Sequence, residues 1–230
     1  MVRLAQPLPG LEEEEELCVR AARLLQRETG CTRGVDISID KNIPMGGGLG
    51  GGSSDAATTL IALNRLWNLG LSRQRLVELG AVLGADVPFF LYGENAFGEG
   101  VGEQLSPAVL PRRWYAVLVP PVSVPTRDIF AAPELTRDTK SIKISSFSAG
   151  LGHNDLEPVV CRRYASVAAH LAWLKGFGDA RMSGSGAGVF AEFPTEMQAR
   201  EVVAGLPPEM RGFAAGGLDR HPLAADPSGN

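Results

Sequence analysis

The sequence predicts an α+β fold, because segments with the patterns of strands and of helices are mixed along the chain and do not alternate strictly. Apolar and polar residues alternate at positions 35–40, which is typical of a half-buried strand. At positions 17–25 and 56–67 the apolar residues instead recur at helical spacing. The 230 residues are enough for one or two domains with a substantial core.

Composition narrows the class of protein. The chain is 44% hydrophobic and 21% charged, which is ordinary for a folded globular protein. Its formal net charge of -4 argues against a nucleic-acid-binding surface, which usually carries a basic stripe. No apolar run reaches the roughly 18 residues that a membrane-spanning helix needs. We therefore expect neither nucleic acid nor membrane as a partner.

The cysteines and the first residues bear on the compartment. Cys18, Cys31 and Cys161 are scattered and lack the spacing of metal ligands, which favours a reducing environment. The first residues also lack the basic and then apolar pattern of a signal peptide. We expect a cytoplasmic protein that is a monomer or a weak homodimer.

The elements before the glycine-rich segment are a strand fragment within 1–10, a helix and a strand at 35–39. The helix follows an acidic run at 12–16, and acidic residues in a first helical turn complement the helix dipole. Its apolar face comprises Leu17, Ala21, Leu24 and Leu25.

After the glycines, Ser53, Ser54 or Asp55 is a candidate cap for a helix with Ala56, Leu60, Leu63 and Trp67 on its apolar face. Residues 84–93, "GADVPFFLYG", resemble a turn into a short buried strand. Further helices are predicted at 72–83, after 153–160 and at 198–204, and further strands at 114–121 and at the end of 183–193. We expect an N-terminal domain over 1–108 and a C-terminal domain over 109–230.

The segment "KNIPMGGGLGGGSSDAA" (41–57) is the strongest local signal, since six of the seven residues from Gly46 to Gly52 are glycine. A strand, a glycine loop and a helix in this order form an anion site, because backbone N–H groups and the helix dipole both favour phosphate. A flexible linker is a poor alternative, because hydrophobic periodicity resumes on both sides.

Three phosphate-binding interpretations compete. The spacing Gly46-x-Gly48-x-x-Gly51 matches the dinucleotide fingerprint, but no acidic residue follows in "LWNLGLS" about 20 positions on. The Walker A pattern needs a lysine where this chain has Ser53. The third interpretation is a nucleotide loop that uses serines and no lysine.

"IPMGGGLGGGSSDAA" (43–57) resembles the ATP-binding motif of the GHMP kinases. "GADVPFF", "VPTRDIF", "NDLEPVV" and "MSGSGAGVFAEF" follow in the order typical of one branch of that family. The substrate of this branch is 4-diphosphocytidyl-2-C-methyl-D-erythritol, an intermediate of the non-mevalonate (MEP) route to isoprenoid precursors. The resemblance runs from the helix near residue 19 to about residue 217. It implies the GHMP kinase fold, with two domains and the active site in the cleft between them.

The resemblance also implies roles for particular residues. Asp86 matches the catalytic aspartate that accepts the proton of the substrate's 2-hydroxyl. Phe130 matches an aromatic residue that stacks on cytosine, and Lys41 matches a position near the nucleotide base. The ATP phosphates would be wrapped by Pro44, Met45, Gly46, Gly47, Gly48, Leu49, Gly50, Gly51, Gly52, Ser53 and Ser54, and the loop that closes the site would be Ser183, Gly184, Ser185 and Gly186. ATP would be the phosphate donor, with Mg²⁺ whose ligands the sequence does not identify.

Residue chemistry alone leaves other interpretations open. By themselves, an aspartate such as Asp86 is more often a surface or capping residue, and a phenylalanine such as Phe130 is more often a core residue. Ser54 and Asp55 fit helix caps as well as magnesium contacts. His153, His170 and His221 have neither metal-site nor catalytic-triad spacing, so we interpret them as structural.

The family pattern begins with a motif resembling "PAKINLFL", whose lysine is a second catalytic residue, and then a "GYH"-like segment that holds the cytidine. The sequence given matches the family from beyond both motifs. We therefore expect an incomplete N-terminal domain. Two alternatives to the kinase of this branch stay open: a catalytically incomplete nucleotide-binding fragment, and a GHMP kinase with another small alcohol substrate.

Overall fold

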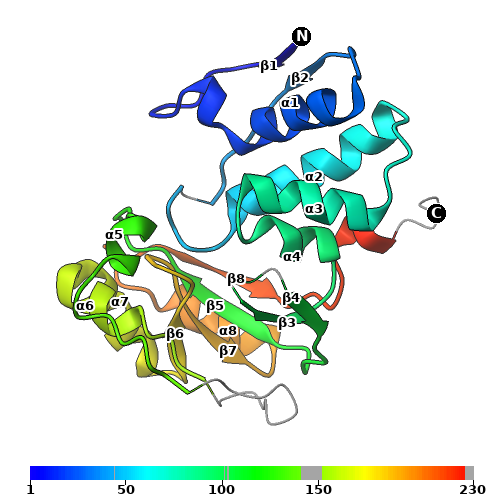
Figure 1. The fold of residues 1–230 in the computed structure, drawn as a ribbon. Helices are drawn as coiled ribbons and strands as arrows, with labels where there is room; N and C mark the ends of the chain where they lie inside the picture. The colour runs from blue at the N-terminus through cyan, green and yellow to red at the C-terminus, as the bar shows by residue number, and fades with distance from the viewer. Residues whose placement is uncertain (44, 101, 103, 141–151, 226–230) are drawn as a thin grey trace. The chain divides into compact units, whose positions relative to one another are not determined.

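The computed structural model describes residues 1–230 except 44, 101, 103, 141–151 and 226–230 (Figure 1). The chain forms two compact units. Unit 1 comprises Met1–Asn42, Gly50–Val109 and Asp219–Asn230, and unit 2 comprises Ile43–Leu49 and Leu110–Leu218. The units are interleaved in the sequence, whereas we expected two continuous segments that meet at residue 108; the functional division into domains stays a prediction.

Unit 1 combines helices with two small sheets. Strand β1 pairs in parallel with β2, and β3 pairs antiparallel with β4. The elements are β1 (Val2–Leu4), the 3-10 helix η1 (Glu13–Glu15), α1 (Leu17–Thr29), β2 (Val35–Ile37), α2 (Gly51–Leu66), α3 (Arg73–Leu83), α4 (Val87–Tyr92), β3 (Ala96–Glu99), β4 (Gln104–Pro107) and the 3-10 helix η3 (Pro222–Ala225).

The core of unit 1 lies mainly between α1 and α2, which pack together along their apolar faces. Leu24 and Leu25 of α1 and Leu60 and Leu63 of α2 are buried there, as the helical spacing predicts. Ser72 caps α3 through a hydrogen bond from the Arg75 N–H, which confirms the predicted start of that helix.

The acidic run does not occupy the first turn of α1. Glu13–Glu15 form η1, and Glu16 is the N-cap of α1, with its carboxylate accepting a hydrogen bond from the Cys18 N–H. Glu16 is only 2% exposed. The prediction that the acidic residues form the first turn of the helix is therefore wrong. The Glu16 side chain caps α1, so the helix begins at Leu17, after the acidic run.

Residues 87–92 form a helix, α4, so the strand predicted within 84–93 is wrong. Pro88 stands in the first turn, where its missing N–H costs nothing, and Gly93 ends the helix with φ 83°. A short buried apolar run has no periodicity that separates strand from helix, so this ambiguity is inherent in the sequence. Asp86, expected on a turn before a strand, is instead the N-cap residue of α4.

Unit 2 is built on a four-stranded antiparallel sheet of order β6-β7-β5-β8. Helix α7 packs on β6 and β7, and α8 packs on β5, β7 and β8 (Figure 1). The elements are β5 (Trp114–Leu118), α5 (Thr126–Phe130), α6 (Glu157–Arg163), α7 (Ala165–Lys175), β6 (Ala180–Met182), β7 (Val189–Phe193), α8 (Glu196–Ala204) and β8 (Gly212–Gly216).

The predicted strands at 114–121 and at the end of 183–193 are confirmed as β5 and β7, and the predicted helix at 198–204 as α8. The helix predicted after 153–160 exists as α6 but begins earlier, at Glu157. Mixed helix and strand content confirms the α+β class. Within the described ranges, no helix combines the length and apolar character needed to cross a membrane.

The substitution Gly80→Ala tests the packing of α3 on α4. A Cβ at Gly80 would meet Leu91 Cδ1 and would lie 3.0 Å from Val87 Cγ1. Glycine-to-alanine changes in a helix normally stabilise it by about 1 kcal/mol. Gly80→Ala should instead lower the free energy of unfolding by about 1–3 kcal/mol, because the core is overpacked. Urea denaturation measures this change.

The matched control is Val82→Ala, at an exposed position of the same helix, which should stay within about 0.5 kcal/mol of the wild type. A Gly80→Ala protein more stable than the wild type would contradict the packing of α4 as a helix.

Candidate phosphate-binding site

The glycine loop belongs to unit 2 up to Leu49, and Gly50 begins the part of the chain that belongs to unit 1. Gly46, Gly48 and Gly50 have φ of 72°, 67° and 69°, in the left-handed region that favours glycine. Pro44, one of the predicted loop residues, lies outside the described residues. Met45 is 49% exposed.

Two hydrogen bonds join the glycine loop to the loop between β6 and β7. The Gly188 N–H donates to the Gly47 carbonyl at 2.8 Å, and the Ser183 hydroxyl donates to the Gly48 carbonyl at 2.7 Å. A Cβ at Gly48 would lie 2.5 Å from the carbonyl oxygens of both Ser183 and Gly186. The two loops that the sequence separately predicts are therefore in direct contact, and the contact requires glycine at position 48.

The β6–β7 loop is itself a tight turn. The Ser183 N–H donates to the Gly188 carbonyl at 2.8 Å, and the Gly186 N–H donates to the Ser183 carbonyl at 3.0 Å. The hydroxyls of Ser185 and Thr126 lie 2.7 Å apart and share a hydrogen bond. The loop is thereby attached to α5, which carries Phe130.

Phe130 is at the end of α5 with 54% of its surface exposed, so it is not a core residue. Its carbonyl accepts a hydrogen bond of 2.6 Å from Arg137 Nη2, which also donates to the Ala132 carbonyl at 3.2 Å. An exposed aromatic ring on a fixed backbone is suited to stacking on a planar ligand.

Helix α2 begins without a capping side chain. Its N-cap is Gly50, so the interpretation of Ser53, Ser54 or Asp55 as caps is wrong. The first N–H groups of an α-helix have no intrahelical acceptor, and no side chain among the described residues accepts from them here. The helix start therefore presents the unpaired donors of Gly51, Gly52 and Ser53 and the positive end of the helix dipole, which together favour an anion.

Lys41 is engaged within unit 1. Its Nζ lies 3.0 Å from the carboxylate of Asp55 in α2 and 3.4 Å from that of Glu16. Burial lowers the pKa of the Lys41 ammonium, but the hydrogen bonds and charges of Asp55 and Glu16 outweigh burial and raise it above its ordinary value. This ammonium is therefore a fixed positive charge that links the N-termini of α1 and α2.

Asp86 is exposed at the N-cap position of α4, and no hydrogen bond or ion pair of its carboxylate occurs among the described residues. Helix α4 packs against α2, and a Cβ at Gly50 would lie 2.9 Å from the Phe90 ring. The helix that carries Asp86 thus abuts the start of α2, where the unpaired N–H groups are. A carboxylate left without a protein partner there is suited to accept a proton.

The histidines do not form a catalytic or metal-binding group. His153 Nε2 lies 2.9 Å from Asp155, and His170 is buried with Nδ1 2.7 Å from the Ser166 carbonyl. Burial, followed by the charge of Arg73, lowers the pKa of His221. The described residues contain no cluster of three His, Cys, Asp or Glu side chains placed to hold a metal ion.

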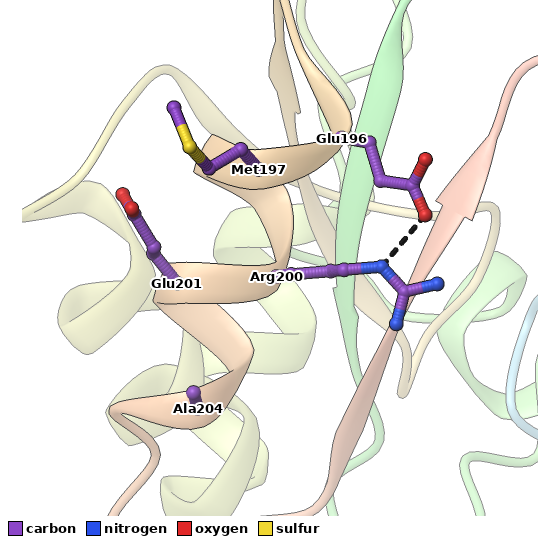
Figure 2. A pocket seen from close by; sticks show the side chains of 5 residues that line it. All are labelled: Glu196, Met197, Arg200, Glu201 and Ala204. Carbon is purple, nitrogen blue, oxygen red and sulfur yellow. Dashed lines mark hydrogen bonds and ion pairs between the residues drawn. The ribbon is translucent and has the colours of Figure 1, made fainter.

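An open depression on α8 is lined by Glu196, Met197, Arg200, Glu201 and Ala204 (Figure 2). Figure 2 shows Arg200 turned toward Glu196, with 2.7 Å between Nε and Oε1. All five residues lie on one helix, and the ion pair has the i, i+4 spacing of a solvated helix surface. None of them is a predicted site residue, so we do not assign the chemistry to this depression.

Several contacts that support the site were not predicted from the sequence. Asp55 and Glu16 pair with Lys41, Asn154 holds the β6–β7 loop, and Phe90 packs at Gly50. Asn154 lies in the quoted "NDLEPVV" segment, so its place in a motif was the available signal. The other partners are brought together only by the tertiary structure.

Comparison with known proteins identifies the protein family. The family "GHMP kinases N terminal domain" matches residues 16–94, and "GHMP kinases C terminal" matches residues 135–211. Among solved structures, a homoserine kinase from Cytophaga hutchinsonii has a TM-score of 0.67 at 16% identity, over 96% of this chain and 83% of that one, and so shares the fold.

Other relatives are similar to this chain at higher sequence identity. The chain is 63% identical to a 4-diphosphocytidyl-2-C-methyl-D-erythritol kinase of Thiobacillus denitrificans, over 94% of this chain and 78% of that protein. It is 59% identical to the protein of the same name from Nitrosospira multiformis, over 97% and 77%. A crystal structure of 4-(cytidine 5'-diphospho)-2C-methyl-D-erythritol kinase matches with a TM-score of 0.79 and 31% identity, over 94% of this chain and 81% of that one. The chain belongs to the GHMP kinase family.

Gly48→Ala tests the contact between the two loops. The new methyl group would meet two carbonyl oxygens at 2.5 Å, and the residue would also be strained at φ 67°. We expect Mg-ATP to bind at least about ten-fold more weakly. The glycine loop would have to shift to relieve the clash, and its backbone would lose the geometry that we propose for binding phosphate. Isothermal titration calorimetry measures this change.

Gly70→Ala is the matched control, since Gly70 has φ 66° and open space at its Cβ. It should cost about 1–2 kcal/mol of stability from backbone strain and leave Mg-ATP affinity unchanged. Equal affinity in the wild type and a folded Gly48→Ala protein would contradict the loop contact.

Lys41→Met removes the partner of Glu16, which is 2% exposed. We expect a loss of about 1–3 kcal/mol in the free energy of unfolding, because a buried carboxylate loses a charged hydrogen-bond donor. The raised pKa of Lys41 means that its contribution is fully present below about pH 10.5 and is lost as pH rises through the native pKa. Urea denaturation at pH 7, 9 and 11 measures both effects.

Lys140→Met is the control, since Lys140 is exposed and should change stability by less than about 0.5 kcal/mol. A difference between Lys41→Met and wild type that grows above pH 10.5 would contradict the assigned role of the lysine.

Proposed function

We propose that this kinase transfers the γ-phosphoryl group of ATP to the 2-hydroxyl of 4-diphosphocytidyl-2-C-methyl-D-erythritol, in the non-mevalonate route to isoprenoid precursors. The observation that carries the proposal is 63% identity to a relative of that name over 94% of this chain. Identity at this level extends through both units, and so covers the glycine loop, Asp86, Phe130 and the β6–β7 loop.

The site supplies what phosphoryl transfer needs, which is positioning and charge stabilisation more than covalent chemistry. We assign the ATP phosphates to the glycine loop and to the uncapped start of α2. There the N–H groups of Gly51, Gly52 and Ser53 have no acceptor in the part of the chain that the structure describes, and would donate to phosphate oxygens. Because the helix start is fixed by packing against α4, these donors need no reorganisation during the reaction.

Asp86 is the proposed general base. Its carboxylate would accept the proton of the acceptor hydroxyl as that oxygen forms a bond to the γ-phosphorus and the bond to the β-phosphate oxygen breaks, leaving ADP. The exposed carboxylate has no competing ion pair in the described part of the chain, which supports this role. Its position at the start of a helix limits how far it can move.

Phe130 is the proposed platform for the cytosine ring. Its 54% exposure and the two hydrogen bonds from Arg137 to the adjacent backbone support a fixed, accessible aromatic surface. Ser183, Gly184, Ser185 and Gly186 would form the loop beside the substrate, and Thr126 on α5 is already hydrogen-bonded to Ser185.

Mg²⁺ would bind with ATP, because magnesium in such sites is usually held by one or two protein groups together with substrate phosphates. The Ser54 hydroxyl fits this requirement, since it makes no hydrogen bond among the described residues, whereas Asp55 is paired with Lys41. When bound, Mg²⁺ supplies neutralisation of phosphate charge. We place the reaction in the cytoplasm, which the three free cysteines support.

Asp86→Asn tests the function directly. With Mg-ATP and 4-diphosphocytidyl-2-C-methyl-D-erythritol, phosphorus NMR should detect a new phosphomonoester with the wild type. The variant should lose at least about 100-fold in rate, because the hydroxyl proton has no acceptor. Mg-ATP affinity should change little, since the amide has the same shape.

Asp138→Asn is the control, because Asp138 is also an exposed aspartate and is not a predicted site residue. A wild type that binds Mg-ATP but forms no product would indicate the catalytically incomplete nucleotide-binding protein. Product with another small alcohol, but not with the cytidine compound, would indicate a different GHMP kinase substrate.

A further inference from the structure

Asn154, just before α6, makes hydrogen bonds on both sides of Ser183. Its Nδ2 donates to the Met182 carbonyl at 3.0 Å and to the Gly184 carbonyl at 2.7 Å. Its Oδ1 accepts from the Leu156 N–H at 3.0 Å, which fixes the side chain against the start of α6. Both amide hydrogens are thus used on the two carbonyls that flank Ser183.

Glu157, three residues later, holds the same strand end. Its Oε2 accepts from the Met182 N–H at 2.9 Å, and its Oε1 lies 3.4 Å from Lys175 Nζ. The two backbone polar groups of Met182 are therefore bound by two side chains from one segment. With the Met182 and Gly184 carbonyls held by Asn154 and the Ser183 carbonyl held by the Gly186 N–H, the backbone at Ser183 is fixed and the direction of its hydroxyl is limited.

The Ser183 hydroxyl transmits this constraint to the glycine loop. It donates to the Gly48 carbonyl at 2.7 Å, while the Gly188 N–H donates to the Gly47 carbonyl at 2.8 Å. All these residues belong to unit 2. A continuous series of hydrogen bonds thus runs from the start of α6, through the β6–β7 loop, to the backbone that approaches the nucleotide.

We propose that Asn154, supported by Glu157, is a positioning residue for ATP that fixes the glycine loop through Ser183. This role rests on one part of the proposed function, namely that the glycine loop binds the ATP phosphates. Asn is specific here: aspartate has no N–H donors for the two carbonyls, and glutamine has an extra methylene that breaks the short bond to the Leu156 N–H.

Asn154→Asp keeps the acceptor for Leu156 but places a carboxylate against two carbonyl oxygens. We expect about a ten-fold rise in the Kd and the KM for Mg-ATP, because two hydrogen bonds that order the loop are lost. The KM for the cytidine substrate should change by less than about two-fold. Hydrogen exchange should accelerate in peptides that span 183–188 and 45–50.

Asn64→Asp is the matched control. Asn64 also uses its amide on the backbone, donating to the Leu71 carbonyl at 2.9 Å and accepting from the Leu71 N–H at 3.0 Å. It should show comparable destabilisation with unchanged Mg-ATP affinity. Asn154→Ala is a second variant, which removes the donors without adding charge.

A double-mutant cycle separates positioning from local stabilisation. If Asn154 acts through Ser183, the losses of Mg-ATP affinity in Asn154→Ala and Ser183→Ala should not add in the double variant. Unchanged Mg-ATP affinity in either folded Asn154 variant, or full additivity, would overturn the inference. If neither Asn154 variant folds, unchanged Mg-ATP affinity in Ser183→Ala would overturn it.

The binding measurements also distinguish this inference from the proposed function. A wild type that binds Mg-ATP but does not phosphorylate the cytidine substrate would contradict the proposed reaction. The Mg-ATP affinities of the Asn154 variants would still test the role of Asn154. A wild type that does not bind Mg-ATP would reject both.

Discussion

The site depends on two hydrogen bonds, from the Ser183 hydroxyl to the Gly48 carbonyl and from the Gly188 N–H to the Gly47 carbonyl. They join backbone segments at least 135 residues apart in the chain, and the two backbones approach so closely that no side chain fits at Gly48. This contact explains why Ile43–Leu49 belongs to unit 2 although α2, which follows directly, belongs to unit 1. The conformational freedom of glycine is used here for the close approach of one backbone to another.

The polar groups of the site fall into two sets. Glu16, Lys41 and Asp55 neutralise one another, and Asn154 and Glu157 satisfy the backbone around Met182. The first N–H groups of α2 and the carboxylate of Asp86 have no partner among the described residues. The paired set orders the scaffold, and the unpaired set comprises the groups to which we assign phosphate binding and proton acceptance.

Family membership and geometry support one another at different levels. The relatives identify the chemistry as that of a GHMP kinase, and the structure shows how the residues that we propose for it are held. Asp86 is the clearest case, because the helical form of 87–92 places it at a helix start fixed by the packing of Leu91 and Val87 at Gly80. A strand, as the local sequence suggested, would have held the carboxylate by different contacts.

The sequence by itself determined the α+β class, the amphipathic helices and the family, because hydrophobic periodicity and motif order are local properties of the chain. Leu60 and Leu63 of α2 and the strand at Trp114–Leu118 follow directly from such patterns. Tertiary structure decided whether 87–92 is helix or strand, since a short buried apolar run fits both. It also decided that Gly50 and not a serine begins α2, that Lys41 pairs with Asp55 and Glu16, and that Asn154 holds Met182 and Gly184. These contacts depend on which distant segments pack together. The spacing of side chains along one segment does not indicate which residue elsewhere in the chain they will contact.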